Sequence, residues 1–459
     1  MDLGQLSFKQ LPPSKEKITD PKEIAKVYTR WRWRMFIGMY LGYMVFYFTR
    51  KNIAPALPLF GEKLALDIVQ LGILSTVFYI VYGIGKFVSG LLADRSNIRT
   101  FMAFGLLCAS IIHLFYGYLT SLYALVFFWG LNGAFQSMGF PPVAKALVHW
   151  FCPNERATKW ALWSSSHTAG TFGIGILIAW ILSMYSKGLL DWRAIFYIPG
   201  AIGVVTSLVM LVMLRDRPVS MGLPPIDKYK NVSYPVEKTK EDVSHWKILK
   251  KYVFTNPYLW ALCFSYIFVY LIRFGTLDWA TKFMYDVKGI SAVKVALFWS
   301  LMPLGGIAGG IVAGYLADKV WGGRCAPCNV LYLILLIFSI WGFYVYAGPD
   351  NYFATGFYLL AIGFFVDGPQ VLVGGVQVSR ITVKEAVATA CGLSGWFGYI
   401  GAAFSGVGLA YITKVYGWGG MYGACMISCV IAGGLMAIAW NKEKEDHYNH
   451  KKKHAKCCS

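Results

Sequence analysis

Long apolar stretches, each of about twenty residues and separated by short polar breaks, run through most of this 459-residue chain. A helix of that length rises 1.5 Å per residue and crosses a hydrocarbon core of about 30 Å. The chain is 57% hydrophobic and only 14% charged, whereas soluble proteins carry about 25% charged residues. A soluble globule is excluded, because it would lack a polar surface. We predict an all-α polytopic membrane protein with twelve spans, at residues 35–56, 69–93, 101–119, 122–147, 159–184, 193–214, 257–284, 293–318, 326–347, 353–379, 385–411 and 418–440.

Positive charge is concentrated on one side of the predicted membrane. The net charge of +20 would suggest a nucleic-acid partner in a soluble protein. Here about 31 of the 43 Lys and Arg fall in the two tails, the middle loop and the short loops in phase with them, which is the positive-inside pattern. We therefore expect cytoplasmic termini and no nucleic-acid partner. The N-terminus resembles neither a secretory signal nor a transit peptide, which favours a bacterial inner membrane.

A charged middle segment divides the chain into two halves. The segment Arg215-Asp216-Arg217-Pro218 ends the sixth span, and a Pro-Pro pair and mixed charges follow it. At the other end of the first half, Trp31-Arg32-Trp33-Arg34 is typical of an interfacial anchor. We expect a cytoplasmic tail at 1–34, a six-helix bundle at 35–214, a linker at 215–256 with a surface helix at 241–252, a second six-helix bundle at 257–440 and a tail at 441–459.

The two halves are related by an internal repeat. Gly90-Leu-Leu-Ala-Asp94-Arg95 closes the second span and Gly314-Tyr-Leu-Ala-Asp318-Lys319 closes the eighth, at an offset of 224 residues (314 − 90). The first copy, extended to Arg99, resembles the loop motif of the major facilitator superfamily, in which two six-helix halves form parallel repeats. The alternative is a plain positively charged loop. We expect Asp94, Arg95, Arg99, Asp318 and Lys319 to control gating.

An arginine lies at matched depth in each half. Arg50 and Arg273 are 223 residues apart (273 − 50), and each lies roughly 23 Å along its helix, near or just beyond the membrane midplane. A buried arginine in a bilayer costs roughly 2.5–3.5 kcal/mol, so a repeated one needs a reason. A local acid could be that reason, but Asp278 is the one carboxylate close by in either span. We therefore interpret the pair as two uncompensated cations that grip a doubly charged anion, since guanidinium groups fit phosphate oxygens.

Other polar residues inside the spans allow more than one interpretation. Lys86 could line the same cavity or extend toward the end of its span, as we expect of Lys145. His167 could bond a local carbonyl or gain a proton as phosphate arrives. Asp367 could pair with a cation, repel bare phosphate, or lie in a kink near water. We expect Lys51 to point away from Arg50, because it lies about 100° round the helix.

The ten cysteines have no framework spacing. Cys325-Ala-Pro-Cys328 is a lone CxxC without a second pair, so we expect no metal site and no cofactor. Cys457-Cys458 could be acylated, although we favour no role for them.

Several segments together resemble the organophosphate:phosphate antiporter family of the major facilitator superfamily, and within it the hexose-phosphate transporter and sensor branch. They are Tyr47-Phe-Thr-Arg50-Lys-Asn52, Tyr82-Gly-Ile-Gly-Lys86-Phe, Asp94-Arg-Ser-Asn-Ile-Arg99, Gly139-Phe-Pro-Pro142, Gly222-Leu-Pro-Pro225 and Tyr270-Leu-Ile-Arg273 with Leu277-Asp-Trp279. The resemblance implies a monomeric carrier that exchanges a sugar phosphate, glucose-6-phosphate first, for inorganic phosphate by alternating access. It implies substrate-binding roles for Arg50, Arg273, Lys86, His167, Tyr43, Tyr47, Tyr82 and Tyr270, with Trp163 and Gln136 as weaker candidates.

The chain also departs from the family pattern. An Asp and a Lys of the hexose-phosphate transporters are replaced here by Cys391 and Ser394, Asp367 replaces an aromatic residue, and Pro303 stands where relatives often have a glutamate. Substrate identity is therefore open, and glycerol-3-phosphate is an alternative to the hexose phosphate. A receptor that senses external sugar phosphate with little transport is a second alternative. A membrane phosphatase is not expected, because no nucleophile–base arrangement lies in a span.

Overall fold

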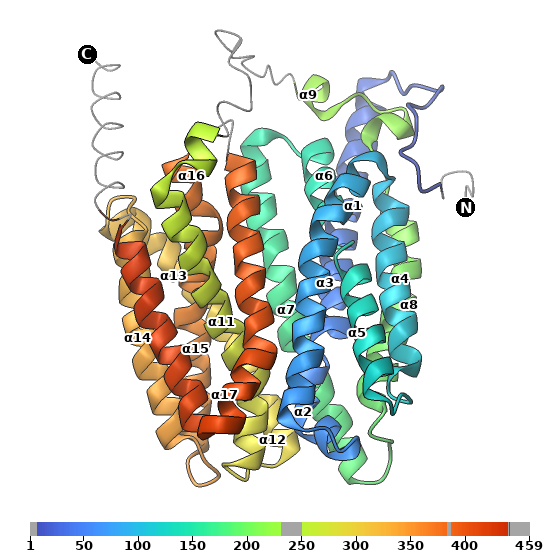
Figure 1. Cartoon of the computed structure of the whole chain (residues 1–459). Coiled ribbons are helices and arrows are strands. Elements are labelled where there is room, and N and C mark those ends of the chain that lie inside the picture. The colour runs from blue at the N-terminus through green and yellow to red at the C-terminus, as the bar shows by residue number, and fades with distance from the viewer. Residues whose placement is uncertain (1–6, 231–249, 383–386, 439, 441–459) are drawn as a thin grey trace. The chain divides into compact units, whose positions relative to one another are not determined.

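The computed structural model describes residues 7–230, 250–382, 387–438 and 440. Within these ranges every regular element is helical, apart from one isolated bridge between Lys9 and Ser96 (Figure 1). The predicted all-α fold is therefore confirmed. Most of the surface helix expected at 241–252 and the tail from residue 441 onward, including Cys457 and Cys458, lie outside the described residues.

The chain forms two compact units. Unit 1 comprises Met1–Ile53 and Val81–Lys238, and unit 2 comprises Ala54–Ile80 and Thr239–Ser459. Residues 54–80 belong to the first bundle in our sequence-based division but to unit 2 in the structure. The domain boundaries at 35–214 and 257–440 stay a prediction.

Helices α1 and α4–α8, with the second half of α3, build unit 1. Their bounds are α1 Pro21–Lys51, α3 Ile68–Arg95, α4 Ile98–Tyr116, α5 Leu122–Gln136, α6 Phe140–Trp150, α7 Pro153–Ser186 and α8 Ala194–Met213, followed by the short η2 Pro218–Met221 and α9 Ile226–Tyr229. The side chain of Asp20 caps α1 by accepting the N–H groups of Lys22 and Glu23. Proline causes two of the breaks between helices. Pro55 has no N–H to donate to the carbonyl of Lys51, where α1 ends, and the two prolines after Phe140 separate α5 from α6.

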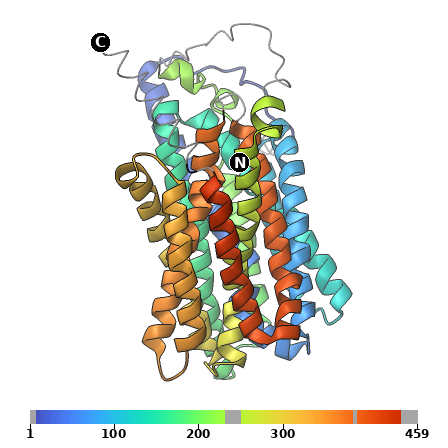
Figure 2. The same cartoon turned by 60° about the vertical axis from the view of Figure 1, so that its left-hand side comes forward.

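Unit 2 contains the remaining helices. They are α2 Ile53–Lys63 from its second residue, the first half of α3, η3 Lys250–Phe254, α11 Pro257–Asp286, α12 Ala292–Trp299, α13 Leu301–Tyr315, η4 Leu316–Val320, α14 Ala326–Tyr346, α15 Tyr352–Val371, η5 Leu372–Gln377, α16 Val378–Ile381 and α17 Val387–Ile438. Within this unit α11 packs against α17 and α13 packs against α15 (Figure 2). Helix α17 contains two of the predicted spans, joined at Gly417, whose φ of 69° is left-handed.

Nine helices of the described residues are long and apolar enough to cross a membrane. Helix α1 carries the short helix expected before the first span and most of that span, whose last residues, 53–56, lie in α2. The predicted span 122–147 is divided into α5 and α6, and α17 holds two spans. These elements account for the twelve predicted spans.

Residues 7–18 form a strap across one end of unit 1, although the sequence predicted only a polar tail there. The backbone N–H of Gln10 donates to the carbonyl of Arg95 over 3.1 Å, and the N–H of Asn97 donates to the carbonyl of Phe8 over 2.9 Å. Further along, the N–H of Ile18 donates to the carbonyl of Gly222 over 3.0 Å. The strap therefore links the α3–α4 loop to the segment after α8.

Candidate functional site

Arg50 lies in an aromatic environment at the end of α1. The residue is 6% exposed, and its guanidinium carbon is 4.0 Å from the ring centroid of Tyr82 and 5.1 Å from that of Tyr47. Aromatic faces attract a cation, by up to about 2 kcal/mol when both are desolvated. The rings thus help to keep a charge inside the bundle at a position where insertion is costly.

Amide side chains of α5 hold the last turn of α1 in place. Gln136 donates from Nε2 to the hydroxyl of Thr49 over 2.8 Å, and Asn132 donates from Nδ2 to the carbonyl of Thr49 over 3.0 Å. Both amides are at most 2% exposed. Gln136, predicted as a weaker substrate-binding candidate, therefore binds the residue that precedes Arg50 and helps to orient the last turn of α1.

A continuous set of rings connects the other candidates of unit 1. The ring of Tyr47 is 5.7 Å from Tyr43 and 5.6 Å from His167, and Tyr43 is 4.7 Å from Trp163. Nδ1 of His167 is hydrogen-bonded to the carbonyl of Ser164, so one ring nitrogen has the local partner that we considered. The structure therefore brings Tyr43, Tyr47, Trp163 and His167 together beside Arg50.

Close helix contact makes this arrangement possible. A Cβ at Gly170 would lie 2.4 Å from the carbonyl oxygen of Met44 and 2.8 Å from Cβ of Tyr47. Only glycine allows α7 to approach α1 this closely. Because His167 lies one turn before Gly170, this contact sets the distance between His167 and Tyr47.

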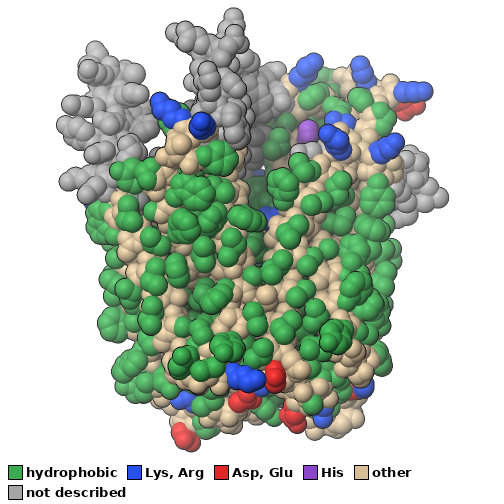
Figure 3. All heavy atoms as spheres, viewed as in Figure 1, with side chains coloured by type: hydrophobic (Ala, Val, Ile, Leu, Met, Phe, Trp, Pro, Cys, Tyr) green, Lys and Arg blue, Asp and Glu red, His purple; other side chains and the backbone are tan. Residues whose placement is uncertain are grey.

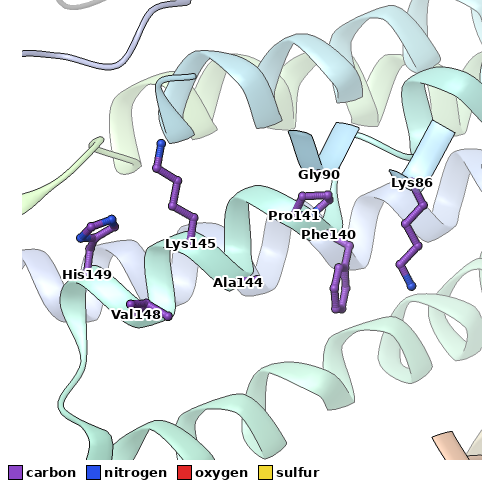
Figure 4. A pocket seen from close by; sticks show the side chains of 8 residues that line it. All are labelled: Lys86, Gly90, Phe140, Pro141, Ala144, Lys145, Val148 and His149. Atoms are coloured by element: carbon purple, nitrogen blue, oxygen red, sulfur yellow. The ribbon is translucent and has the colours of Figure 1, made fainter. Parts of the chain in front are cut away.

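Lys86 lines a pocket of about 520 Å³ within unit 1. Its ammonium lies 4.6 Å from the ring centroid of Phe140, and Figure 4 shows the two side chains extending to the same side. Lys145 extends the other way and donates to the carbonyls of Ala93 and Ser96, over 3.0 and 2.7 Å, near the end of α3 (Figure 4). Of the predicted substrate-binding residues, Lys86 alone lines this pocket, so its place in the phosphate cavity stays a prediction, whereas Lys145 lies near a helix end as expected.

Arg273 of unit 2 has a carboxylate partner. Its Nε donates to Oδ1 of Asp367 over 2.7 Å, and the two side chains are 17% and 11% exposed. The expectation that both arginines are uncompensated is therefore wrong for Arg273, because α15 supplies an acid from a distant part of the sequence. The same contact decides the open role of Asp367 in favour of pairing with a cation.

Tyr270 and Tyr266 stand next to Arg273 on α11. Their rings are 4.6 Å apart, their hydroxyls lie 3.4 Å apart, and Tyr266 donates to the carbonyl of Gln370 over 3.0 Å. We predicted Tyr270 from the sequence and missed Tyr266. The signal was present, because Tyr266 and Tyr43 are 223 residues apart (266 − 43), the offset that also relates the two arginines. The repeated pattern is Tyr-x₃-Tyr-x₂-Arg.

The packing of α13 against α15 positions Asp367. A Cβ at Gly306 would lie 2.1 Å from Oδ2 of Asp367, so any larger residue there would displace the carboxylate. Pro303 is buried in the same helix. In α17, Cys391 is half-buried and Ser394 is fully buried.

The predicted gating residues lie in different environments. Arg99 is 3% exposed and its Nε donates to the carbonyl of Leu211 in α8. Arg95, Asp318 and Lys319 are exposed, and the last two lie in η4, whereas the side chain of Asp94 lies outside the described part of the structure. Arg99 thus stabilises a helix end, and gating by these residues stays a prediction.

The CxxC pair lies in an apolar cluster. Cys325 and Cys328 are buried with Ala313 and Tyr332, and the thiol of Cys328 lies 3.5 Å from the carbonyl of Ala313. Among the described residues no group of three or more His, Cys, Asp and Glu side chains could hold a metal ion.

Sequence comparisons place this geometry among transporters. A profile of the Major Facilitator Superfamily matches residues 39–371. The chain is 39% identical over 450 residues to a probable hexose phosphate transport protein of Chlamydia pneumoniae, covering 96% of this chain and 98% of that one. It is 36% identical to the membrane sensor protein UhpC of Escherichia coli (strain K12), and 33% identical to a glycerol-3-phosphate transporter of Bacillus subtilis (strain 168), each over 94% of this chain and 97% of the relative.

Solved structures agree at the level of the fold. An inward-facing bacterial homologue of the human lysosomal transporter Spinster superposes with a TM-score of 0.68 at 15% identity, covering 92% of this chain and 98% of that chain. The fold is that of membrane transporters, and the relatives named above include transporters of hexose phosphate and of glycerol-3-phosphate. The chain belongs to the major facilitator superfamily and, within it, to the organophosphate:phosphate antiporter family.

Proposed function

We propose that the protein exchanges a sugar phosphate, with glucose-6-phosphate as the first candidate, for inorganic phosphate by alternating access. Arg50 and Arg273 bind the phosphoryl group jointly in this proposal, and it acts as a monomer in the inner membrane with both termini in the cytoplasm. The observation that carries it is the repeated Tyr-x₃-Tyr-x₂-Arg pattern, which gives each half one arginine that follows two tyrosines on the same helix face; Arg50 is buried and the side chain of Arg273 is 17% exposed.

The surroundings of the two arginines support different roles for them. Arg50 lies against the rings of Tyr47 and Tyr82, which stabilise its charge. Arg273 already has Asp367 as a partner, so a phosphoryl group must compete with that carboxylate. A dianionic phosphate offers more acceptor oxygens and one more charge than a carboxylate, and guanidinium binds such groups bidentately.

The competition supplies a physical reason for exchange. A ligand shifts a conformational equilibrium only by its different affinity for the two states. Phosphate that binds Arg50 and displaces Asp367 from Arg273 stabilises the closed intermediate, whereas the empty carrier keeps its internal ion pair. The return step then needs an anion as well, which makes the process an antiport.

Counterflow in vesicles tests this proposal. Purified protein is reconstituted into vesicles that contain either no phosphate or unlabelled phosphate at about 20 times the concentration of labelled phosphate outside. Uptake of the labelled phosphate is then followed. We expect uptake into loaded vesicles to exceed uptake into empty vesicles many-fold. Equal uptake would exclude obligatory exchange.

Conservative substitutions test the two arginines. Arg50→Lys and Arg273→Lys keep the charge but lose the planar fork, and each lost charged hydrogen bond costs about 1.5–3 kcal/mol. We expect exchange to fall at least about tenfold in each variant. Arg193→Lys is the matched control, because Arg193 forms an exposed pair with Asp191 over 2.7 Å. Exchange at the wild-type rate in both site variants would remove the assignment.

The same vesicles can distinguish between candidate substrates and between transport and sensing. Glucose-6-phosphate, glycerol-3-phosphate and phosphoenolpyruvate are compared as inhibitors of phosphate exchange. The similarity to UhpC favours a receptor as the second candidate function. Rapid flux by the purified protein decides for transport, while tight sugar-phosphate binding without flux decides for the receptor.

A further inference from the structure

Two arginines lie over the ring of one tryptophan in the first part of α1, and a third arginine lies close enough to Arg215 to affect its charge. The guanidinium carbons of Arg34 and Arg215 lie 4.4 and 4.3 Å from the ring centroid of Trp31. Arg99 adds a third guanidinium from α4, and its Nε donates to the carbonyl of Leu211. We call Arg34, Arg99, Arg215 and Trp31 the arginine cluster.

The arginines of the cluster converge on the end of α8. Arg34 donates to the carbonyl of Val212 over 3.3 Å, and Arg215 donates to the carbonyls of Val212 and Leu214 over 3.2 and 2.8 Å. The C-terminus of a helix carries about half a negative charge. The charges of Arg34 and Arg215 together exceed this partial charge, so a positive potential remains beside these two arginines.

The neighbouring carboxylate is engaged elsewhere. Asp216 is 1% exposed, accepts the backbone N–H groups of Leu11 and Ile98, and lies 3.8 Å from Nε of Arg217. Within the part of the chain that the structure describes, the recorded partners of Arg34 and Arg215 are carbonyl oxygens and the Trp31 ring. Burial, with the charges of Arg99 and Arg34, lowers the pKa of Arg215 to about 10.

Exposed apolar side chains continue from the cluster along both helices. On α1 they are Ile37 and Leu41, 43% and 41% exposed, one and two turns beyond Arg34. On α8 they are Val212 and Leu208, 41% and 54% exposed, one and two turns before Arg215. Figure 3 shows Lys and Arg side chains gathered at this end of unit 1, with apolar side chains along the helices below them. The basic cluster matches the charged headgroup of a phospholipid, and the two rows of exposed apolar side chains match its acyl chains.

We propose that the arginine cluster is a binding site for one anionic phospholipid, with the headgroup phosphate on Arg34 and Arg215 and the acyl chains along the exposed faces of α1 and α8. Basic pockets next to membrane-spanning helices recognise such headgroups, and tryptophan is enriched at headgroup level. A pocket lined by Arg32 and Lys159 differs from the arginine cluster, because Glu155 pairs there with Arg32. The proposal needs only that the chain spans a membrane and is independent of the transported substrate.

Native mass spectrometry of the full chain in detergent tests the site. Delipidated protein is titrated with dioleoyl-phosphatidylglycerol, and separately with dioleoyl-phosphatidylcholine, which has the same chains but no net charge. We expect one retained phosphatidylglycerol adduct, and an at least fivefold weaker affinity in the double variant Arg34→Gln/Arg215→Gln, since each basic residue near anionic lipid contributes about that factor. The double variant Arg34→Lys/Arg215→Lys should retain most of the affinity, because the charge remains.

Matched controls keep the outcome decisive. Arg193→Gln removes a cation at the opposite end of α8, where Asp191 pairs with it, and should leave lipid affinity unchanged. Monodisperse elution and an unaltered unfolding temperature without added lipid establish that the double variant is folded. Equal affinity of wild type and the glutamine double variant, or equal retention of the two lipids, would overturn the proposal. So would displacement of the lipid by free glycerol-3-phosphate, which would identify a site for soluble phosphates instead.

Discussion

Nε of Arg273 and Oδ1 of Asp367 lie 2.7 Å apart and join α11 to α15 inside unit 2. The pair neutralises the arginine that the sequence offered as half of a phosphate grip. Removing one partner of a buried pair leaves the other charge uncompensated, which is costly. Phosphate binding and release of Asp367 are therefore linked steps in the proposed cycle.

Asp367→Asn should raise the affinity for phosphate and slow exchange. The asparagine keeps the shape of the side chain but no longer competes for the guanidinium, and a hydrogen bond to a charged group is worth about 1.5–3 kcal/mol. We expect the apparent Kd for phosphate to fall about tenfold. The turnover rate should fall too, because release of the anion now leaves Arg273 without a countercharge. Equilibrium binding and counterflow measure the two quantities.

The control for this experiment is Asp286→Asn. Asp286 pairs over 2.8 Å with Lys282, and both residues lie in α11, the helix of Arg273. This variant should alter neither quantity. A loss of phosphate affinity in Asp367→Asn would contradict competition and show that the carboxylate only orients Arg273.

The matched arginines could be predicted from the sequence, but the partner of Arg273 could not. The repeat offset of 223 residues (273 − 50) is visible in the letters alone. Asp367 is 94 residues from Arg273, and their meeting depends on the packing of α11 and α15 in three dimensions. Applied more fully, the same repeat would also have indicated Tyr266 as the counterpart of Tyr43.

The strap at residues 7–18 is a second feature that could not be predicted from the sequence. Its contacts with Arg95, Asn97 and Gly222 are made by backbone groups, which every residue carries, so no side-chain pattern marks them. The division of the fourth span has an evident cause instead, because two prolines follow Phe140 and neither can donate to the preceding turn.

The ring of Tyr82, more than its hydroxyl, should support Arg50. Tyr82→Phe keeps a ring 4.0 Å from the guanidinium carbon, whereas Tyr82→Leu removes it. A cation–π contact contributes about 0.5–2 kcal/mol, so we expect exchange to fall about 2- to 30-fold in the leucine variant and less than about threefold in the phenylalanine variant. Phosphate counterflow compares them. Equal loss in the two variants would mean that the hydroxyl contacts the substrate instead.

Gly306→Ala should disturb the ion pair without touching either charge. The new methyl group would lie 2.1 Å from Oδ2 of Asp367, and overpacking of this kind costs about 1–3 kcal/mol. We expect a lower unfolding temperature and a changed phosphate affinity. Gly310→Ala is the control on the same helix, because its methyl group would meet Cγ2 of Val371 at an ordinary 3.5 Å. Matching unfolding temperatures in the two variants would rule out the close approach.

Glu155 should make the junction of α1 and α7 sensitive to acid. Burial tends to raise the pKa of this carboxyl, but hydrogen bonds from Arg32 and from the backbone N–H of Cys152 outweigh it and leave the pKa below its usual value. A group whose folded-state pKa is depressed contributes stability above its unfolded pKa, and that contribution is lost as the pH falls through the folded pKa.

Glu155→Gln should therefore lower the unfolding temperature at pH 7, and the difference from wild type should shrink below about pH 4.3, the ordinary pKa of glutamate. Thermal unfolding in detergent between neutral and acidic pH measures the difference. The exposed Asp191→Asn serves as the comparison, since its pair with Arg193 is in contact with solvent and contributes little. A difference between Glu155→Gln and wild type that stays constant over the whole pH range would show that the glutamate acts through packing and not through its charge.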